Sequence, residues 1–164
     1  MNKLFFKIPF KNIAIIALIA IFFIADRILK SLAIKLKPDE SFALIGQIFT
    51  FKFTPNYHIA FSLPLEGWIL NAIIVTVVLL LIYYIFYLIL NKKNNKREIL
   101  LLTVILFGAI SNILDRCLYG YVVDYLELRF FTVFNLADVM ISGGALLMII
   151  FNFNFKDKRI GNID

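Results

Sequence analysis

The sequence predicts an all-α membrane protein with four transmembrane helices, and three observations support this fold class. Hydrophobic residues make up 62% of the 164 residues and charged residues only 17%, and the mean hydropathy is +0.89. Soluble domains rarely reach such values. Four apolar runs each approach the ~20 residues that cross a bilayer. Basic residues gather in three of the segments that flank these runs.

The four predicted spans are residues 13–29, 68–90, 99–114 and 136–155. The third is the shortest. The first follows three lysines and could instead be a secretory signal peptide. No A-x-A cleavage pattern follows it, and ADRILK continues its helix, which favours a membrane span. We expect a single membrane domain over residues 1–164, with no repeat and no second domain.

The distribution of charge predicts how the spans are oriented. The two terminal segments and the NKKNNKRE loop hold ten cations and three acids, a net charge of +7. The segments on the other side hold seven cations and eight acids, a net charge of −1. The positive-inside bias therefore places both termini and this loop in the cytoplasm. The basic excess reports topology and is a poor argument for nucleic-acid binding.

Two segments, residues 31–67 and 116–135, remain on the extracytoplasmic side. In the first, IFTFKFT alternates phenylalanine with threonine and lysine, which is the period of a strand with one apolar face. We expect a small β-sheet that lies against the membrane. The second segment contains Gly120 and many aromatic residues, which suit the membrane interface. We expect a loop or helix there.

Four carboxylates are predicted to gather near the outer boundary of the membrane. At 1.5 Å rise per residue, Asp115 and Asp26 lie roughly 24 and 20 Å from the cytoplasmic edge of their spans. Asp138 opens the fourth span from outside, and Asp124 lies just before it. An ion carrier would distribute such acids through the depth of the membrane. The pattern favours one site at one level.

Polar residues recur at three- and four-residue intervals on the last two spans. These stripes are Gly108, Asn112, Asp115 and Arg116 on the third span, and Asn135, Asp138 and Ser142 on the fourth. Such stripes face protein or water. Asp26 and Lys30 stand four residues apart and are expected to form an ion pair, which is more often structural than catalytic. Gly143, Gly144 and Ala145 would let a neighbouring helix approach closely.

The residue inventory excludes several peptidase chemistries. His58 is the only imidazole, and neither G-x-S-x-G nor H-E-x-x-H is present. With one His and one Cys, the chain cannot build a zinc site from these ligands, and Cys117 lacks a plausible base. Two carboxylates that share a proton remain, one acting on a water and the other on the scissile carbonyl. No metal or cofactor is required. Spacing alone leaves open whether Asp115 or Asp124 belongs to the pair.

Five sequence blocks resemble the ordered motifs of bacterial lipoprotein signal peptidase, also called signal peptidase II. The blocks are DRILK at 26–30, PNYHIAF at 55–61, GAISNILDR at 108–116, VVDY at 122–125 and FNLAD at 134–138. The resemblance covers nearly the whole chain. It implies an aspartyl endopeptidase of the cytoplasmic membrane that removes signal peptides from prolipoproteins, cutting before the diacylglyceryl-modified Cys. The implied partners are these substrates and membrane lipid, with no nucleic acid.

The same resemblance assigns site residues. It places the catalytic pair on Asp124 and Asp138. Positions that support the pair or hold the substrate backbone fall on Asn56, Asn112, Asp115, Arg116 and Asn135. Asp26 and Lys30 are expected in the same supporting set. Asp115 is expected to order the site together with Arg116 rather than to act in catalysis. Because this site is complete in one chain, a monomer is the simplest expectation.

Two departures from the family pattern affect the expected site. The family has Gly two residues after the loop asparagine, where this chain has His58, so the placement of Asn56 is left open. We expect His58 to face solvent. The connection between Asp124 and Asp138 is compact, which predicts a short lid over the pair.

Two alternatives come from other classes. A non-catalytic scaffold or transporter subunit would use its interfacial carboxylates only to stabilise helix packing. Changes from acid to amide would then affect stability or assembly first. A channel-like cation pathway is disfavoured because the acids lie at one depth.

Overall fold

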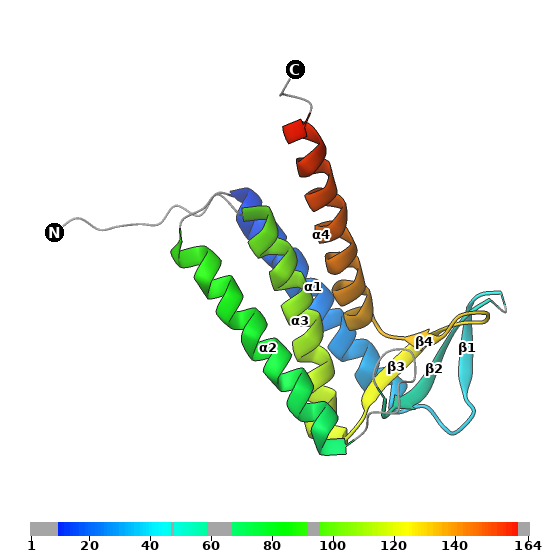
Figure 1. Cartoon of the computed structure of the whole chain (residues 1–164). Coiled ribbons are helices and arrows are strands. Elements are labelled where there is room, and N and C mark those ends of the chain that lie inside the picture. The colour runs from blue at the N-terminus through cyan, green and yellow to red at the C-terminus, as the bar shows by residue number, and fades with distance from the viewer. Residues whose placement is uncertain (1–9, 47, 59–66, 92–95, 161–164) are drawn as a thin grey trace.

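The computed structural model describes residues 10–46, 48–58, 67–91 and 96–160, which form four helices and one small antiparallel sheet (Figure 1). The helices are α1 (Phe10–Ala33), α2 (Gly67–Leu90), α3 (Lys96–Tyr119) and α4 (Leu136–Ile160). Helix α3 packs against the other three. The expectation of a mostly helical protein with a small sheet is confirmed.

Two of these helices, α2 and α3, are long and apolar enough to cross a membrane, judged by length and composition. The apolar part of α4 is shorter and covers Leu136–Phe151. Helices α1 and α3 extend beyond the predicted spans 13–29 and 99–114. The apolar runs stop early because polar side chains follow them, and these side chains are paired inside the protein, so the helices continue.

Helix α3 ends at a glycine. Gly120 has a φ of +83°, and its N–H donates to the carbonyl of Arg116 at 3.0 Å. This left-handed residue after the last turn is a common helix C-cap. The predicted outer segment therefore begins about one turn later than residue 116.

The sheet has the order β1-β2-β3-β4, with β1 at Ser41–Ile45, β2 at Phe49–Asn56, β3 at Val122–Leu128 and β4 at Val133–Phe134. All neighbouring strands are antiparallel. Strand β2 confirms the strand predicted from IFTFKFT. The expectation of a loop or helix at residues 116–135 is wrong for residues 122–128 and 133–134, which add two strands to the same sheet. VVDYLEL forms a strand because β2 is available as its partner.

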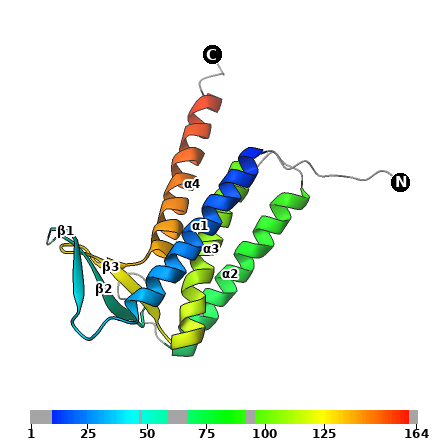
Figure 2. The same ribbon diagram turned by 180° about the vertical axis from the view of Figure 1, so that it is seen from behind.

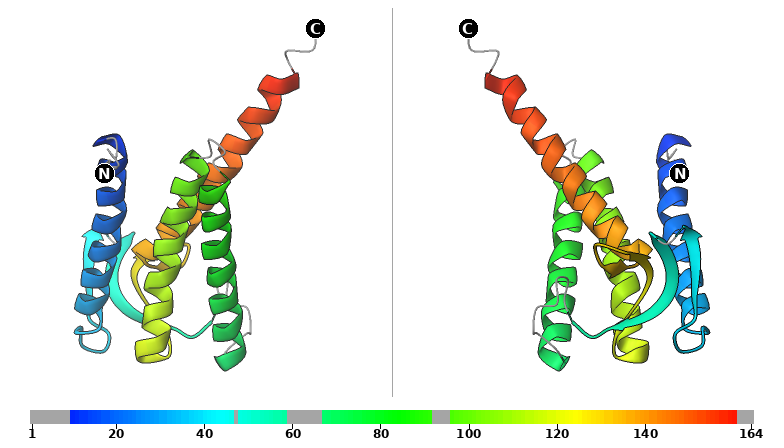
Figure 3. Two further views of the ribbon diagram at one scale, coloured as in Figure 1. Left: turned by 90° about the vertical axis from the view of Figure 1, so that its left-hand side faces the viewer. Right: turned by 90° about the vertical axis from the view of Figure 1, so that its right-hand side faces the viewer.

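One face of the sheet packs on the end of α1, as Figures 2 and 3 show. Ala33, Val123 and Tyr125 are fully buried there, and the Phe51 and Tyr125 rings lie 5.6 Å apart. This small core fixes β3 against the helices, so that Asp124 on β3 faces the start of α4.

Helices α3 and α4 approach closely at two glycines. A Cβ on Gly108 would lie 2.6 Å from the carbonyl oxygen of Ala137, and one on Gly144 would lie 2.7 Å from Cγ1 of Ile105. The close approach predicted at Gly144 is confirmed. The prediction is wrong for Gly143, where a Cβ would meet nothing within 4 Å, because this residue lies about 100° around the helix from Gly144.

We predict that Gly108→Ala lowers the thermal stability of the protein. The added methyl would press on the backbone of α4, and overpacking of this kind costs about 1–3 kcal/mol. Thermal unfolding followed by circular dichroism in detergent measures the change. Gly143→Ala is the matched control and should leave the midpoint unchanged or slightly raised, because its methyl enters open space. Equal midpoints for the two variants would contradict the packing described here.

Candidate active site

Two carboxylates from different elements meet at one asparagine. Asp124 lies on β3 and Asp138 in the first turn of α4. Nδ2 of Asn135 donates to Oδ1 of Asp124 at 2.7 Å. Oδ1 of Asn135 accepts the N–H of Asp138 at 2.8 Å, while Oδ2 of Asp138 accepts the N–H of Asn135 at 3.2 Å. This reciprocal pair is a capping box with asparagine as the N-cap. Asn135 therefore starts the helix and holds both carboxylates.

The second oxygen of each carboxylate is held by another amide. Nδ2 of Asn56 donates to Oδ2 of Asp124 at 2.9 Å, and Nδ2 of Asn112 donates to Oδ1 of Asp138 at 2.8 Å. Both oxygens of both acids thus accept a hydrogen bond from an amide. Neutral donors fix the positions of the carboxylates without pairing them with a cation.

The electrostatics of Asp124 suit proton transfer near neutral pH. Burial and, second, the neighbouring carboxylate of Asp138 raise the pKa of Asp124 to about 7, although hydrogen bonds from Asn56 and Asn135 oppose the rise. Its side chain is almost entirely buried, with the residue 2% exposed. A carboxyl of this pKa can hold a proton beside an ionised partner and release it again.

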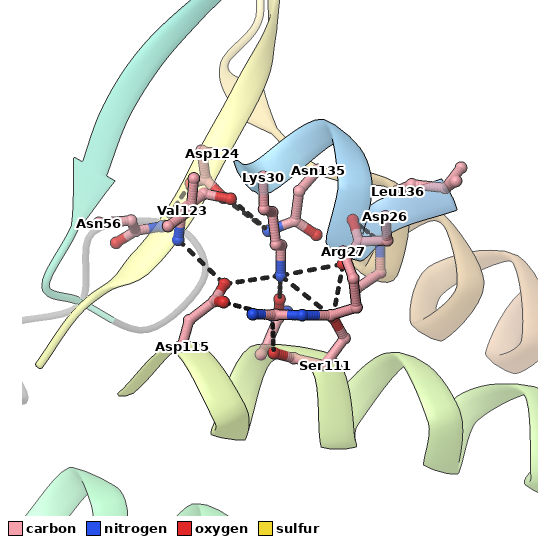
Figure 4. A network of polar contacts seen from close by, with 12 residues as sticks. Asp26, Arg27, Lys30, Asn56, Ser111, Asp115, Val123, Asp124, Asn135 and Leu136 are labelled. Carbon is pink, nitrogen blue, oxygen red and sulfur yellow. Dashed lines mark hydrogen bonds and ion pairs between the residues drawn. The ribbon is translucent and has the colours of Figure 1, made fainter. Parts of the chain in front are cut away.

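A buried cluster of charged residues lies next to Asp124 (Figure 4). Nζ of Lys30 lies 3.1 Å from Oδ2 of Asp26 and 2.7 Å from Oδ2 of Asp115, and all three side chains are fully buried. Arg27 forms an ion pair with the other oxygen of Asp115. The predicted pair of Asp26 and Lys30 is confirmed, as one part of this larger cluster. Ser111 completes it by donating to Asp26 at 2.5 Å.

The cluster reaches both catalytic candidates through Lys30 and Asp115. Lys30 donates to Oδ1 of Asn112 at 2.7 Å, which leaves the Asn112 NH2 group for Asp138. Oδ2 of Asp115 accepts the N–H of Val123 at 3.2 Å, the residue before Asp124. The charged cluster therefore determines the orientation of an amide on one side and the course of β3 on the other.

Asp26 and Tyr125 complete the N-terminus of α4. The Tyr125 hydroxyl donates to Oδ1 of Asp26 at 2.9 Å and accepts the N–H of Leu136 at 3.0 Å. The N–H of Ala137 donates to the same Asp26 oxygen at 3.2 Å. Burial and, second, the Asp26 charge raise the pKa of Tyr125, so that this hydroxyl keeps its proton. An acid at this position also complements the positive end of the helix dipole.

Arg116 contacts the loop that follows Asn56. Its Nη2 donates to the backbone oxygen of His58 at 2.7 Å, whereas Asp115 is engaged by Arg27 and Lys30. Asp115 and Arg116 contact different groups, because consecutive helical residues point in different directions. Arg116 instead supports the loop that follows Asn56.

The His58 departure does not disturb Asn56. Among the residues described, Asp39 is the only non-glycine with a positive φ, so His58 adopts a backbone conformation open to any residue. Its N–H donates to Oδ1 of Asn56 at 3.0 Å, which leaves the NH2 group of Asn56 for Asp124. His58 is partly buried, so the expectation that it faces solvent is wrong. The last three residues of the PNYHIAF block lie outside the described residues.

The structure gathers the predicted residues into two connected layers. Asn56, Asn112, Asp124, Asn135 and Asp138 form the upper layer. Asp26, Lys30 and Asp115 form the buried layer beneath it.

Sequence reasoning missed Arg27, Ser111 and Tyr125. Each lies inside a block that was singled out, but nothing in the spacing shows which neighbour reaches across to another element. Cys117 is exposed and outside both layers. Within the described part of the chain, no group of three His, Cys, Asp or Glu residues is placed to hold a metal ion.

Comparison with known proteins identifies the family. A family described as Signal peptidase (SPase) II matches residues 18–154. The chain is 37% identical to a lipoprotein signal peptidase of Caldicellulosiruptor bescii over 77% of this chain and 81% of that protein. It is 36% identical to those of Halothermothrix orenii, over 90% and 98% of the two chains, and Clostridium tetani, over 88% and 97%.

Two solved structures share the fold. Both are described as bacterial membrane enzymes determined by the in meso method, at 2.3 and 1.9 Å resolution. The first superposes with a TM-score of 0.77 at 22% identity, over 88% of this chain and 90% of that one. The second has a TM-score of 0.69 at 24% identity, over 84% and 90%. Sequence and fold agree: the chain belongs to the signal peptidase II family, aspartic peptidases that remove signal peptides from prolipoproteins.

Proposed function

We propose that Asp124 and Asp138 are the catalytic carboxylates with which this chain cuts diacylglyceryl-modified prolipoproteins just before the lipidated Cys. The observation that carries the assignment is the single asparagine that contacts both acids. Asp115, the other candidate from the sequence, is engaged by two cations and fully buried. A carboxylate neutralised in this way is poorly suited to accept a proton from water.

The geometry supports a general acid–base hydrolysis. One carboxylate of the pair, ionised, takes a proton from a water whose oxygen then attacks the scissile carbonyl carbon. The other, protonated, donates its proton to the carbonyl oxygen, which gives a tetrahedral diol. Breakdown of the diol breaks the C–N bond, returns one proton to the leaving amine and regenerates the shared proton. The amides of Asn56, Asn112 and Asn135 hold the acids in place throughout.

Substrate recognition would combine lipid and backbone contacts. Insertion of the diacylglyceryl chains into the membrane contributes about 0.8 kcal/mol per buried methylene and holds the modified Cys near the site. Recognition of the modified Cys then needs few side-chain contacts. The guanidinium of Arg116 reaches from α3 to the carbonyl of His58, next to Asn56, and its remaining N–H groups could satisfy a carbonyl of an extended peptide.

The same proposal includes the membrane topology. Helices α1 to α4 would all span the cytoplasmic membrane as one domain of residues 1–164, with both termini cytoplasmic and the site near the extracytoplasmic face. Asp26, Arg27 and Lys30 lie at the end of α1 that is near the sheet. Their charges are paired inside the protein, as a membrane requires. Several of the cytoplasmic cations, among them Lys3, Lys7, Lys92 and Lys93, lie outside the described residues. A monomer suffices, because one chain supplies both acids.

We predict that Asp124→Asn and Asp138→Asn each abolish cleavage of a diacylglyceryl-modified prolipoprotein peptide, while each protein remains folded. An amide cannot exchange the shared proton. Peptide cleavage by purified protein in detergent measures the effect. Glu127→Gln is the matched control on the same strand, because Glu127 pairs with Lys52 on the partly exposed side of the sheet; it should cleave normally. Normal cleavage by either aspartate variant would remove that residue from the pair.

Asp115→Asn should act through stability instead. It would leave Arg27 without its counter-charge and Lys30 with Asp26 alone, and breaking a buried pair costs about 3–5 kcal/mol. We expect a lower unfolding temperature. At temperatures well below the unfolding transition, the variant should still cleave the peptide. Complete loss of cleavage in a variant of unchanged stability would show that Asp115 acts in the chemistry.

The rate of cleavage should fall as the pH rises through about 7, since burial and Asp138 raise the pKa of Asp124 to that value. Below it the pair keeps one proton, and above it both acids are ionised. Asn56→Leu removes a hydrogen bond that lowers this pKa, so the fall should move to higher pH. A pH–rate profile for both proteins tests this. An unmoved profile would show that the fall does not report Asp124.

Tyr125→Phe should lower kcat with little change in KM. The variant keeps the buried ring but leaves the N–H of Leu136 without its acceptor, which costs about 1–3 kcal/mol of stability. The first turn of α4, and Asp138 with it, would then be less well positioned. Tyr121→Phe is the control, since the described contacts of Tyr121 are between rings. A rise in KM at constant kcat would instead place Tyr125 in substrate binding.

A further inference from the structure

Two turns at the far end of the sheet form one apolar surface. The β1–β2 turn presents Ile45 and Ile48, and the β3–β4 turn presents Phe130 and Phe131. The N–H of Arg129 donates to the carbonyl of Ile48 at 3.0 Å and so joins the two turns. We refer to these four apolar side chains as the sheet tip.

The side chains of the sheet tip are unusually exposed for their size. Phe130 and Phe131 are 85% and 72% exposed, and Ile45 and Ile48 are 69% and 55% exposed. The β3–β4 turn is nevertheless well defined. The N–H of Leu128 donates to the carbonyl of Thr132 at 3.1 Å, and the N–H of Phe131 donates to the carbonyl of Leu128 at 2.8 Å. A hydrogen-bonded turn that holds large apolar groups away from its own protein indicates a partner surface.

The position of the sheet tip indicates which surface this is. The sheet does not extend past the ends of α2 and α3 but lies beside the helices, with its far end level with the first turns of α4 (Figures 1 and 3). If the helices span the bilayer as proposed above, this level is the membrane interface. Aromatic residues are enriched at that depth.

The charges around the sheet tip also suit phospholipid. Residues 41–49 and 128–134 contain no acid and a single cation, Arg129. Its guanidinium lies 5.6 Å from the centroid of the Phe130 ring. An apolar group beside an arginine matches the acyl chains and phosphate of a lipid. A stable protein partner would use about 20–30 residues a side, far more than these two turns offer.

We propose that the sheet tip inserts into the outer leaflet as an anchor, with phospholipid as its occupant. Strand β3 runs from Asp124 to the turn that carries Phe130 and Phe131. The anchor therefore fixes the depth of Asp124 relative to the bilayer. A substrate whose cleavage site lies next to its own lipid needs a catalytic group at a constant depth.

The test measures the depth of an indole placed at the sheet tip. The chain has one tryptophan, Trp68, so Trp68→Phe/Phe131→Trp carries a single indole there. The protein is reconstituted without substrate in phosphatidylcholine–phosphatidylglycerol vesicles whose acyl chains are brominated. We expect these lipids to quench more than half of its emission, and aqueous acrylamide to quench little. Trp68→Phe/Lys37→Trp, on the exposed connection at the other end of β1, is the matched control and should show the reverse.

The quenching result distinguishes phospholipid from other possible partners of the sheet tip. Absence of quenching by brominated lipid would overturn the proposal. An indole exposed to water would then be quenched by acrylamide, and an indole covered by a second copy of the chain would be quenched by neither agent. The quenching measurement does not depend on cleavage. The anchor proposal can therefore fail while the catalytic proposal holds, and the catalytic proposal can fail while the anchor proposal holds. As a second readout, Phe130→Ser/Phe131→Ser should cleave peptide normally in detergent but several-fold more slowly in vesicles. Equal slowing in both would assign the loss to folding and contradict an anchoring role.

Discussion

The architecture depends on a buried set of charges that join four elements. Asp26, Lys30 and Asp115 are fully buried, and an isolated charge in such a place would be strongly destabilising. Each of these charged side chains must therefore be paired in the folded protein, and this pairing holds α1 against α3. The remaining hydrogen-bonding capacity of the two acids is directed at the backbone of β3 and of α4. The cluster thus sets the spacing between the strand and the helix that carry the two catalytic candidates.

Much of this fold could be predicted from the sequence, because membrane helices and a single alternating strand are local patterns. The apolar runs predicted the helices, and the alternating phenylalanines predicted β2. Strand β3 was missed because its existence depends on pairing with β2, more than sixty residues earlier in the chain, and β4 was missed because it in turn pairs with β3. The helix ends were missed for a related reason. Polar residues end an apolar run, but a helix continues when those residues have partners on another element, as Asp115 has in Arg27.

The candidate site also combines local features, which the sequence predicts, with long-range contacts, which it does not. FNLAD carries a local signature, asparagine followed three residues later by an acid, and the capping box that it forms is a short-range structure. The contribution of Tyr125 could not be predicted, because its hydroxyl acts on residues of α1 and α4 that only the fold brings near. Spacing alone could not rank Asp115 against Asp124. The structure separates them by their surroundings, two cations for one and two neutral amides for the other.

The double use of Asn135 restricts what can occupy that position. Asparagine, aspartate, serine, threonine and glycine all cap helices well. Asn135 must also donate to Asp124 while it accepts from the N–H of Asp138. Aspartate has no proton to donate at neutral pH, and glycine has no side chain. Serine or threonine would have to serve both partners from one oxygen atom, whereas the amide has its acceptor and donor on separate atoms. Of the residues that can begin this helix, only asparagine can also complete the site.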